Sequence, residues 1–516
     1  MKRTFLIIII IALTFGFINA QTPVYLKVSE HGSFENIEHL NSGGYITVGY
    51  DSVYKLLITR WDESFSPIWN YKFTDANIAA VSPKIVEAND GSFYFMTASN
   101  EHTGSTLIVK FSSAGSLLWQ KIYYITTGNM NSFSLSKAIV GDNGFLFGGG
   151  QCTLNNYVIK CDQTGNIEWQ TQYYYPLSTG VTTCVSIIPD GNNYVLTSSY
   201  NVNSLLVSKV SALGTVLSQS AYTYTGMQII PIKMVKLNQN GGYAVVGNYN
   251  NSNDNKTEFV AIYNSLLELL SFNELTVTYT QFTLRDIVAI NNGRNVVVSG
   301  NIYDNSAFNQ AVVCLSNTGS VVWKKRAEGN VGSNRNVEFR GITQKGNYIV
   351  NAGHGYNDGS VISMLDTNGN GLCNNITFDL VNSQKTLALQ TSTITPTTST
   401  VLNSTVNYTH NSLGSYSKYI YCGELSTMDN ESSTLSFSIF PNPAQDKVYI
   451  SFSRNTIGQN ASISIYDLTG KLIYKYSNLG TNNQVEINTS NLKQGVYLIQ
   501  IKGDNGLSEV RKLIIS

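Results

Sequence analysis

The residue types that most often carry enzyme chemistry are sparse in this chain and show no catalytic spacing. The five histidines share no spacing typical of metal ligands: His31, His39, His102, His354 and His410. No GxSxG, HExxH, Walker or dinucleotide-binding pattern occurs in a strand–turn–helix context. Sequence spacing therefore assigns no catalytic residue, and it does not single out a carboxylate pair that could act as acid and base.

One short segment is similar to the first half of a calcium-binding loop. Asp366, Asn368 and Asn370 are spaced like the first three oxygen ligands, but Thr377 stands where the loop needs a carboxylate. The same Asp-x-x-Gly turn opens strands elsewhere in the chain. We therefore favour a hairpin turn and expect no cofactor, with calcium as the alternative.

Groups suited to ligand recognition gather in loops that differ from one another. Segments 248–256, 301–309 and 353–358 supply amide, hydroxyl, ring, imidazole and carboxylate groups, which suit contacts with sugars or peptide. We predict that the ligand binds near the mouth of a central channel, through these residues: Asn250, Asn253, Tyr303, Asp304, His354, Tyr356 and Asp358. The alternative is that Asn-rich loops are simply good turns and that His354 is a solvated loop residue.

These loops belong to a block of about 50 residues that recurs seven times between about residues 24 and 375. One aligned column holds Trp69, Trp119, Trp169, Ser218, Ser271, Trp323 and Cys373. A second column holds Tyr45, Tyr94, Phe145, Tyr194, Tyr243, Val296 and Tyr348. Such self-similarity indicates a solenoid, a propeller or an array. Rings that recur once per repeat are typical of core between repeats, so we expect the four tryptophans at equivalent, mostly buried positions. A ligand-stacking platform is the alternative.

Each repeat contains the pattern of four short strands joined by tight turns. In the third copy the strands are expected at 134–140, 145–149, 157–161 and 167–174, with Gly- and Asp-rich turns between them. Four antiparallel strands per repeat predict an all-β seven-bladed β-propeller over residues 21–377, with an open solenoid as the alternative. Residues 24–28 are expected to be a closing strand of the seventh blade. The strand 2–3 loops and the connections between blades should share the face opposite the tight turns.

Two repeat families resemble this pattern. An aromatic strand, a glycine-ended second strand, a third strand and then Trp resemble the kelch type of propeller, whose double glycine occurs here once, at 148–149. Segments 240–247 and 158–169 more closely resemble the repeats "DGGYIVxG…LIKLDxxGNxxW" of many exported bacterial proteins. The resemblance implies a propeller in an exported protein.

The N-terminus and the charge balance also bear on location and partners. Lys2 and Arg3 precede an apolar run at 5–17, which predicts a signal peptide over residues 1–20, cleaved between Ala20 and Gln21. An uncleaved membrane anchor is the alternative, and no other segment is apolar enough for a transmembrane span. With 33 basic and 33 acidic residues and no basic tract, nucleic acid is a poor candidate partner.

The six cysteines are few for an exported chain of this size and show no CxxC spacing. Cys373 and Cys422 flank the region after the repeats and could form a disulfide in an oxidising compartment. Unpaired buried cysteines are the equal alternative.

The repeat stops near residue 377. Residues 378–435 contain a Thr- and Ser-rich run at 390–405, which predicts a flexible or extended connector. Residues 436–516 alternate with a period of two and predict a small seven-stranded β-sandwich.

Four motifs in this tail, in order, resemble the type A C-terminal sorting domain of the type IX secretion system. They lie at 440–443, 465–471, 495–498 and 512–515, and include Pro441, Asn442, Pro443, Gly495, Tyr497 and Lys512. The resemblance implies that the type IX machinery recognises the tail. It also implies export through the periplasm of a Gram-negative bacterium, then release or attachment at the outer cell surface, usually with removal of the tail. An ordinary β-sandwich binding domain is the alternative.

Three functional hypotheses follow. The first is an exported binding module for a glycan or protein ligand. The second is a secreted enzyme acting on polysaccharide, a glycosidase or lyase with a carboxylate cluster in the channel. The third is a structural adhesin component. Low charge content and the absence of a catalytic motif favour binding.

Overall fold

The structure is a computed structural model of the chain. It describes residues 25–27, 32–51, 55–102, 104–126, 130–151, 156–174, 183–200, 203–238, 241–250, 256–278, 281–304, 307–327, 337–355, 359–371, 375–376, 378–390, 395–397, 402–406, 408, 410–412, 419–420, 437–440, 442–452, 462–467, 470–477, 484–502 and 508–515. Within these ranges the regular elements are β-strands and there is no helix, so the chain is all-β as predicted. Contacts divide it into two units, Met1–Gly423 and Glu424–Ser516.

Six of the seven sheets in the first unit contain four consecutive strands of one repeat, paired antiparallel, and the seventh contains three consecutive strands and the N-terminal strand β1 (Tyr25–Lys27). The first four sheets contain β2 (Ser33–His39), β3 (Tyr45–Tyr50), β4 (Leu56–Trp61), β5 (Pro67–Phe73); β6 (Ile78–Glu87), β7 (Phe93–Ser99), β8 (Ser105–Phe111), β9 (Leu117–Tyr124); β10 (Met130–Lys137), β11 (Phe145–Gln151), β12 (Asn156–Cys161), β13 (Ile167–Tyr174); and β14 (Thr183–Asp190), β15 (Asn193–Tyr200), β16 (Ser204–Ser211), β17 (Val216–Thr223). The other three contain β18 (Gln228–Lys236), β19 (Tyr243–Asn250), β20 (Lys256–Tyr263), β21 (Leu269–Val277); β22 (Gln281–Ile290), β23 (Asn295–Asp304), β24 (Ala307–Ser316), β25 (Val321–Ala327); and β26 (Val337–Lys345), β27 (Tyr348–Gly355), β28 (Gly359–Asp366).

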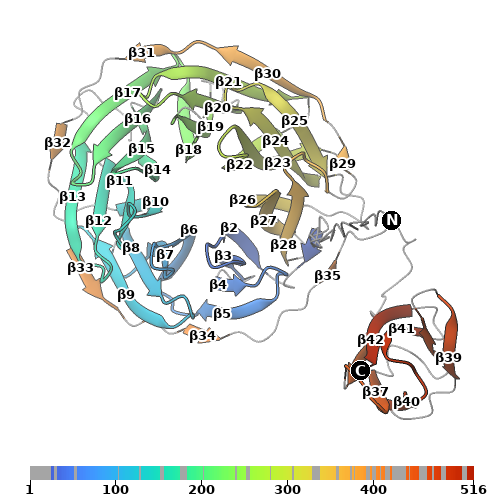
Figure 1. Cartoon of the computed structure of the whole chain (residues 1–516). Helices are drawn as coiled ribbons and strands as arrows, with labels where there is room; N and C mark the ends of the chain where they lie inside the picture. The colour runs from blue at the N-terminus through green and yellow to red at the C-terminus, as the bar shows by residue number, and fades with distance from the viewer. Residues whose placement is uncertain are drawn as a thin grey trace, which may run out of the picture. The chain divides into compact units, whose positions relative to one another are not determined.

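The sheets follow one another around a common centre, with the first strand of each sheet innermost (Figure 1). Each first strand contacts the first strands of its two neighbours, and β2 contacts both β6 and β26. The first and second strands of each sheet are antiparallel, so the start of the first strand lies beside the end of the second strand, as in the pairs β2–β3 and β26–β27. The strand 2–3 loops therefore lie opposite the tight turns, as expected.

Residues 375–420 form an outer strand on every sheet, although their composition predicts a connector. We call this segment the belt; its strands are β29 (Asn375–Ile376), β30 (Leu380–Lys385), β31 (Ala388–Gln390), β32 (Thr395–Thr397), β33 (Leu402–Thr405), β34 (His410–Ser412) and β35 (Tyr419–Ile420). They pair with β25, β21, β17, β13, β9 and β5, and finally with β1 (Tyr25–Lys27). The chain thus returns around the outside in the reverse order of the sheets (Figure 1).

The physical reason for the belt is the open edge that a fourth strand would otherwise present. Unpaired N–H and C=O groups on such an edge favour the addition of another strand. Thr-rich extended chain suits that position because β-branched residues favour strands. Strand β1 pairs with β28, as expected of a closing strand, and is itself covered by β35.

A bulge interrupts the pairing of each first strand with the second strand. In the first sheet a Cβ atom on Gly49 would lie 1.7 Å from the carbonyl oxygen of Ser33. In the sixth sheet a Cβ on Gly300 would lie 1.9 Å from that of Thr283. The glycines that face these bulges in the second strands are therefore required by the close approach of the bulged backbone.

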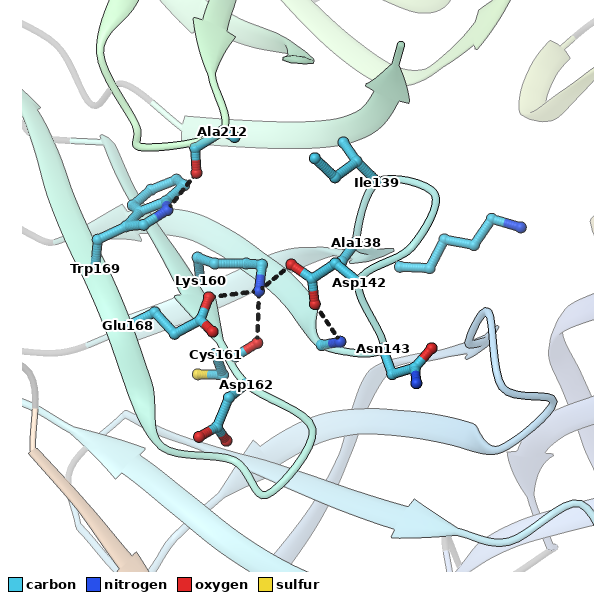
Figure 2. Close-up of polar contacts among 12 residues, drawn as sticks. Ala138, Ile139, Asp142, Asn143, Lys160, Cys161, Asp162, Glu168, Trp169 and Ala212 are labelled. Carbon is cyan, nitrogen blue, oxygen red and sulfur yellow. Dashed lines mark hydrogen bonds and ion pairs between the residues drawn. The ribbon is translucent and has the colours of Figure 1, made fainter. Parts of the chain in front are cut away.

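A buried cation of the third strand holds the tight turns together. In the third sheet Lys160 Nζ lies 2.8 Å from Asp142 Oδ2 and 2.7 Å from Glu168 Oε2, as Figure 2 shows. Burial alone would lower the pKa of Lys160, but its hydrogen bonds to these two carboxylates raise it. Lysines at the same position of two other sheets also pair with a turn aspartate: Lys110–Asp90 and Lys209–Asp190.

The four tryptophans of the column lie at equivalent positions between neighbouring sheets and are partly buried against the core, as the sequence predicts. Trp119 Nε1 donates to the carbonyl oxygen of Gln163 at 3.1 Å, and Trp169 Nε1 to that of Ala212 at 2.7 Å (Figure 2). A Cβ on Gly214 would lie 2.9 Å from the Trp169 ring. Each ring therefore covers a tight turn of the next sheet and is partly buried there.

The second unit contains two antiparallel sheets. One has β36 (Phe437–Phe440), β37 (Lys447–Phe452) and β40 (Gln484–Asn488); the other has β39 (Leu472–Ser477), β38 (Ser462–Tyr466), β41 (Gly495–Lys502) and β42 (Ser508–Ile515). Buried residues of both sheets form one core. Asn442 Nδ2 donates to the carbonyl oxygen of Lys512 at 2.8 Å, and Ile514 N donates to Asn442 Oδ1 at 2.8 Å. Two tail motifs far apart in sequence are thus joined.

Candidate functional site

The first strands of all seven sheets line one cavity of about 330 Å³ at the centre of the first unit. Its walls come from β2, β6, β10, β14, β18, β22 and β26. Sites for small ligands commonly span about 300–1,000 Å³, so this volume suits a small molecule or the end of a longer chain. We take this cavity as the candidate site.

Six bulge residues line the cavity, and we call them the collar: Glu35, Phe133, Val185, Ile232, Arg285 and Arg340. A bulge residue has no partner in the neighbouring strand, so its side chain is redirected from the ordinary alternation. The collar residues of the third, fourth and fifth sheets are apolar, whereas those of the sixth, seventh and first sheets are charged. The cavity therefore has an apolar side and a charged side.

Arg340 organises the charged side of the collar. Its Nη1 lies 2.9 Å from Glu35 Oε2, and its Nη2 lies 3.0 Å from Glu338 Oε2. The hydroxyl of Ser33 donates to Glu35 Oε1 at 2.9 Å. Both carboxylates are therefore matched by a cation, which their largely buried positions require.

Asp286 is the carboxylate of the sixth sheet beside the collar. Lys233 Nζ lies 2.6 Å from its Oδ1, and the backbone N–H of Ile287 donates to the same oxygen at 2.7 Å. Its Oδ2 accepts the N–H of Ile342, on the neighbouring sheet, at 3.0 Å. Asp286 is thus buried, fully partnered and part of the contact between two sheets.

Three cations that line the cavity lack such partners. Within the described part of the chain, no hydrogen bond or ion pair joins the side chain of Lys84, Lys137 or Arg285 to another side chain. Burial lowers the pKa of Lys84, the charge of Asp286 offsets part of that effect, and Lys233 lowers the pKa further. Arg285 is exposed to the cavity solvent.

Glu38 is the carboxyl group of this cavity with the most perturbed titration. Burial raises its pKa to about 7, although the N–H of Glu87 donates to its Oε2 at 3.1 Å and the charge of Lys137 favours ionisation. A carboxyl group with such a pKa holds or releases a proton near neutral pH.

The structure places His354 beside the charged side of the collar. It lies opposite Glu338 in the pairing of β26 with β27, and its Nδ1 is 3.4 Å from the hydroxyl of Ser33. Burial lowers the pKa of His354, and the nearby charge of Arg340 lowers it further. The imidazole is therefore neutral at neutral pH and lies toward the strand 2–3 loop face.

The other predicted binding residues follow the same face at different sheets. Asn250 ends β19 opposite Gln228, and Tyr303 lies near the end of β23, its ring centroid 4.9 Å from that of Phe308. Asp304 ends β23. The remaining three predicted residues lie outside the described residues: Asn253, Tyr356 and Asp358. Asn250, Tyr303 and Asp304 are not among the residues that line the cavity within the described part of the chain.

The candidate calcium residues form the turn after β28. The carboxylate of Asp366 accepts the backbone N–H of Asn368 at 2.9 Å and that of Asn370 at 2.8 Å. The amide of Asn370 donates to its second oxygen at 3.0 Å. These contacts are those of the predicted hairpin turn, and calcium binding stays an untested alternative.

Several sequence predictions fall outside the described residues: the cleavage site at Ala20 and Gln21, the pair Cys373 and Cys422, and Pro441. Three other cysteines are free and buried: Cys161, Cys184 and Cys314. Within the described ranges, no helix is long and apolar enough to span a membrane. The collar residues were not predicted as site residues, because they line the cavity only where a bulge interrupts the regular alternation of the strand.

A family model, a curated relative and solved structures are similar to parts of this chain. Residues 438–516 match the family model of the secretion system C-terminal sorting domain. An endo-acting ulvan lyase of Formosa agariphila is 36% identical over 98 residues, which are 19% of this chain and 18% of the lyase. The chain thus matches less than a fifth of the length of that relative.

Among solved structures, Sqt1 of Chaetomium thermophilum is 12% identical with a TM-score of 0.35, and the alignment covers 68% of this chain and 98% of Sqt1. Sqt1 bound to the N-terminus of ribosomal protein L10 gives 12% identity and a TM-score of 0.35, covering 66% and 98%. Similarity at this level supports no statement about function.

The family match at 438–516 agrees with the tail motifs predicted from the sequence. It also agrees with the hydrogen bonds that join the Asn442 side chain to the backbone of the last strand. The second unit is therefore a C-terminal sorting domain of the type IX secretion system, and the protein is exported and then secreted or held at the cell surface.

Proposed function

We propose that the first unit is a seven-bladed β-propeller that acts outside the cell as a binding module, and that its ligand is a saccharide. In this proposal each of the seven sheets is one blade, and a signal peptide at 1–20 starts export. Contacts between successive first strands, including β2 with β26, support the radial arrangement. A protein ligand and a passive adhesin role are the alternatives.

The observation that carries the binding proposal is the division of the collar into two sides. A sugar ring has a face of C–H groups and an edge of polar groups. Phe133, Val185 and Ile232 offer an apolar surface for the first, while Arg285, Arg340 and Glu35 offer hydrogen-bonding groups for the second. A site with both kinds of wall fixes the orientation of such a ring.

The direction of entry follows from the strand 2–3 loop face. His354 lies at that face, next to the charged side of the collar. The predicted recognition residues Asn250 and Tyr303 lie at the same face of other sheets. A saccharide chain would thus place its end in the cavity and its remaining units along these loops.

A substitution that fills the cavity tests this proposal. Val185→Trp adds a large ring at a collar position, so it should abolish saccharide binding on a glycan array and in calorimetry while the protein stays folded. Val140→Trp is the matched control, because Val140 is 93% exposed on a tight turn. Unchanged binding by Val185→Trp, or equal loss in both variants, would place the site elsewhere.

An enzyme acting on polysaccharide is the second candidate. Glu38 favours it, because a cavity carboxyl group with a pKa of about 7 can act as a general acid or base. The short similarity to an ulvan lyase points the same way. New reducing ends or unsaturated products from acidic or neutral polysaccharides, lost in Glu38→Gln, would establish this candidate; no product from any substrate would refute it.

A further inference from the structure

The carboxylates around the cavity all have partners within the protein. Asp286 is paired with Lys233, Glu35 with Arg340, and Glu338 with the same arginine. Glu38 accepts a backbone N–H, and burial keeps part of its population protonated near neutral pH. No carboxylate on the described cavity wall is therefore left to bind a cationic ligand without losing a partner.

In contrast to these carboxylates, three cations of the described cavity wall have no partner of opposite charge. Lys84, Lys137 and Arg285 line the cavity, and among the described residues no carboxylate lies within ion-pair distance of their side chains. Lys84 is also partly buried, so the cost of removing its charge from water is only partly offset by Asp286 and Glu35 at longer range. An anion that entered the cavity would offset that cost.

We propose that the saccharide bound by this cavity is acidic, with its anionic group held by Arg285 and Lys84. This inference rests on the proposed binding function and adds the ligand's charge to it. Carboxylate and sulfate groups share the required chemistry, because both accept charge-assisted hydrogen bonds from guanidinium and ammonium groups. The sugar's C–H face then lies toward Phe133, on the apolar side of the collar.

A peptide rich in acidic residues has the same charge but a different shape. A cavity of about 330 Å³ accepts one rigid ring more readily than a flexible chain, which loses conformational freedom when it is confined. The apolar side of the collar also has no counterpart in an acidic side chain. The observations therefore favour the saccharide.

The experiment measures the binding of four probes to the full chain by calorimetry. The probes are a short galacturonate oligomer, the same oligomer as its methyl ester, a sulfated galactan oligomer, and a glutamate peptide. The ester keeps the same sugar units and replaces each carboxylate charge by a neutral methyl ester. We expect the free acid to bind at least about tenfold more tightly than the ester, since hydrogen bonds to charged groups exceed neutral ones by that order. Higher salt should reduce the difference.

Arg285→Gln tests the assigned residue. It should weaken binding of the free acid about tenfold and leave the ester within about twofold. Arg294→Gln is the matched control, because Arg294 is an exposed arginine in the tight turn of the same sheet. Melting curves check that both variants are folded.

The outcomes separate this inference from the binding function. Equal affinity for acid and ester would overturn the inference and leave saccharide binding intact. Binding of the glutamate peptide alone would overturn saccharide binding, and binding of no probe would overturn both. A preference for the galacturonate or for the sulfated probe, lost in Arg285→Gln, would support the inference and identify the anionic group.

Discussion

Leu387 and Leu389 give a matched test of whether the belt is part of the fold. They lie two residues apart, Leu387 between β30 and β31 and Leu389 in β31. Leu387 is 7% exposed and packs with Tyr243 and Phe259, whereas Leu389 is 69% exposed. The change is Leu→Ala at each position in otherwise identical chains.

The expected effects differ because the two side chains have different environments. Removing three buried carbons from Leu387 costs about 2.4 kcal/mol at roughly 0.8 kcal/mol for each carbon, and a residual cavity adds to it. We therefore expect Leu387→Ala to lower the free energy of unfolding by about 2–4 kcal/mol. Leu389→Ala should change it by no more than about 0.5 kcal/mol.

Guanidinium unfolding followed by tryptophan fluorescence measures this difference, because the tryptophans contact neighbouring sheets of the first unit. The two variants should differ in midpoint, with Leu389→Ala close to the unmodified protein. If both variants unfold like the unmodified chain, the belt does not pack against the sheets, and residues 378–420 are the loose connector that their composition suggests.

Three further predictions concern the bulges, the cavity and the tail. Gly300→Ala should destabilise the fold far more than Gly191→Ala. An added Cβ would lie 1.9 Å from a backbone oxygen at Gly300 but within 4 Å of nothing at Gly191, where only the left-handed backbone costs about 1–2 kcal/mol. Equal unfolding midpoints of the two variants would contradict the bulge geometry. Burial raises the pKa of Glu38 from 4.5 to about 7 in the folded state, so its ionisation destabilises the fold as pH rises through that interval. Glu38→Gln should therefore be more stable than the unmodified protein above pH 7 and lose that advantage below pH 4.5. Melting curves measured against pH test this. Deleting residues 512–516 should leave the first unit folded and retain it in the periplasm on cell fractionation, and its appearance in the medium would show that sorting does not need this strand.

The sequence predicted the sheets well because their turns are punctuated by glycine. A column of aromatic residues and repeated Gly-containing turns fix four strands in each repeat, and local turn chemistry is visible without a structure. The tail was equally readable, since its motifs are short, ordered and specific. Both depend on interactions close in sequence.

The belt was not predictable from the same signals. Its strands are short and its composition is dominated by Thr and Ser, so it has no periodic apolar pattern of its own. Its anchors are single residues such as Phe378, Leu387 and Tyr408, which are buried only because the sheets are already there. Composition reports whether a segment can form a core, but not whether a neighbouring edge is available to it.

The collar was missed for a related reason. Arg285 and Arg340 lie in strands whose alternation is broken by a bulge, so counting by two assigns their side chains to the wrong side. A glycine faces the bulge in five of the seven sheets, as Gly300 does opposite Leu284, and it was the available signal. His354 was predicted from a single loop segment, whereas its neighbours Glu338 and Arg340 come from a different strand.

The central claim is that the ligand enters the cavity between the first strands. Hydrogen exchange with and without the galacturonate oligomer tests it directly, because alternate amides of an innermost strand face the cavity and have no partner strand on that side. The account predicts slower exchange in β2, β6, β10, β22 and β26 on binding. Slower exchange confined to the tight turns, at 291–294 and 344–347, would contradict it.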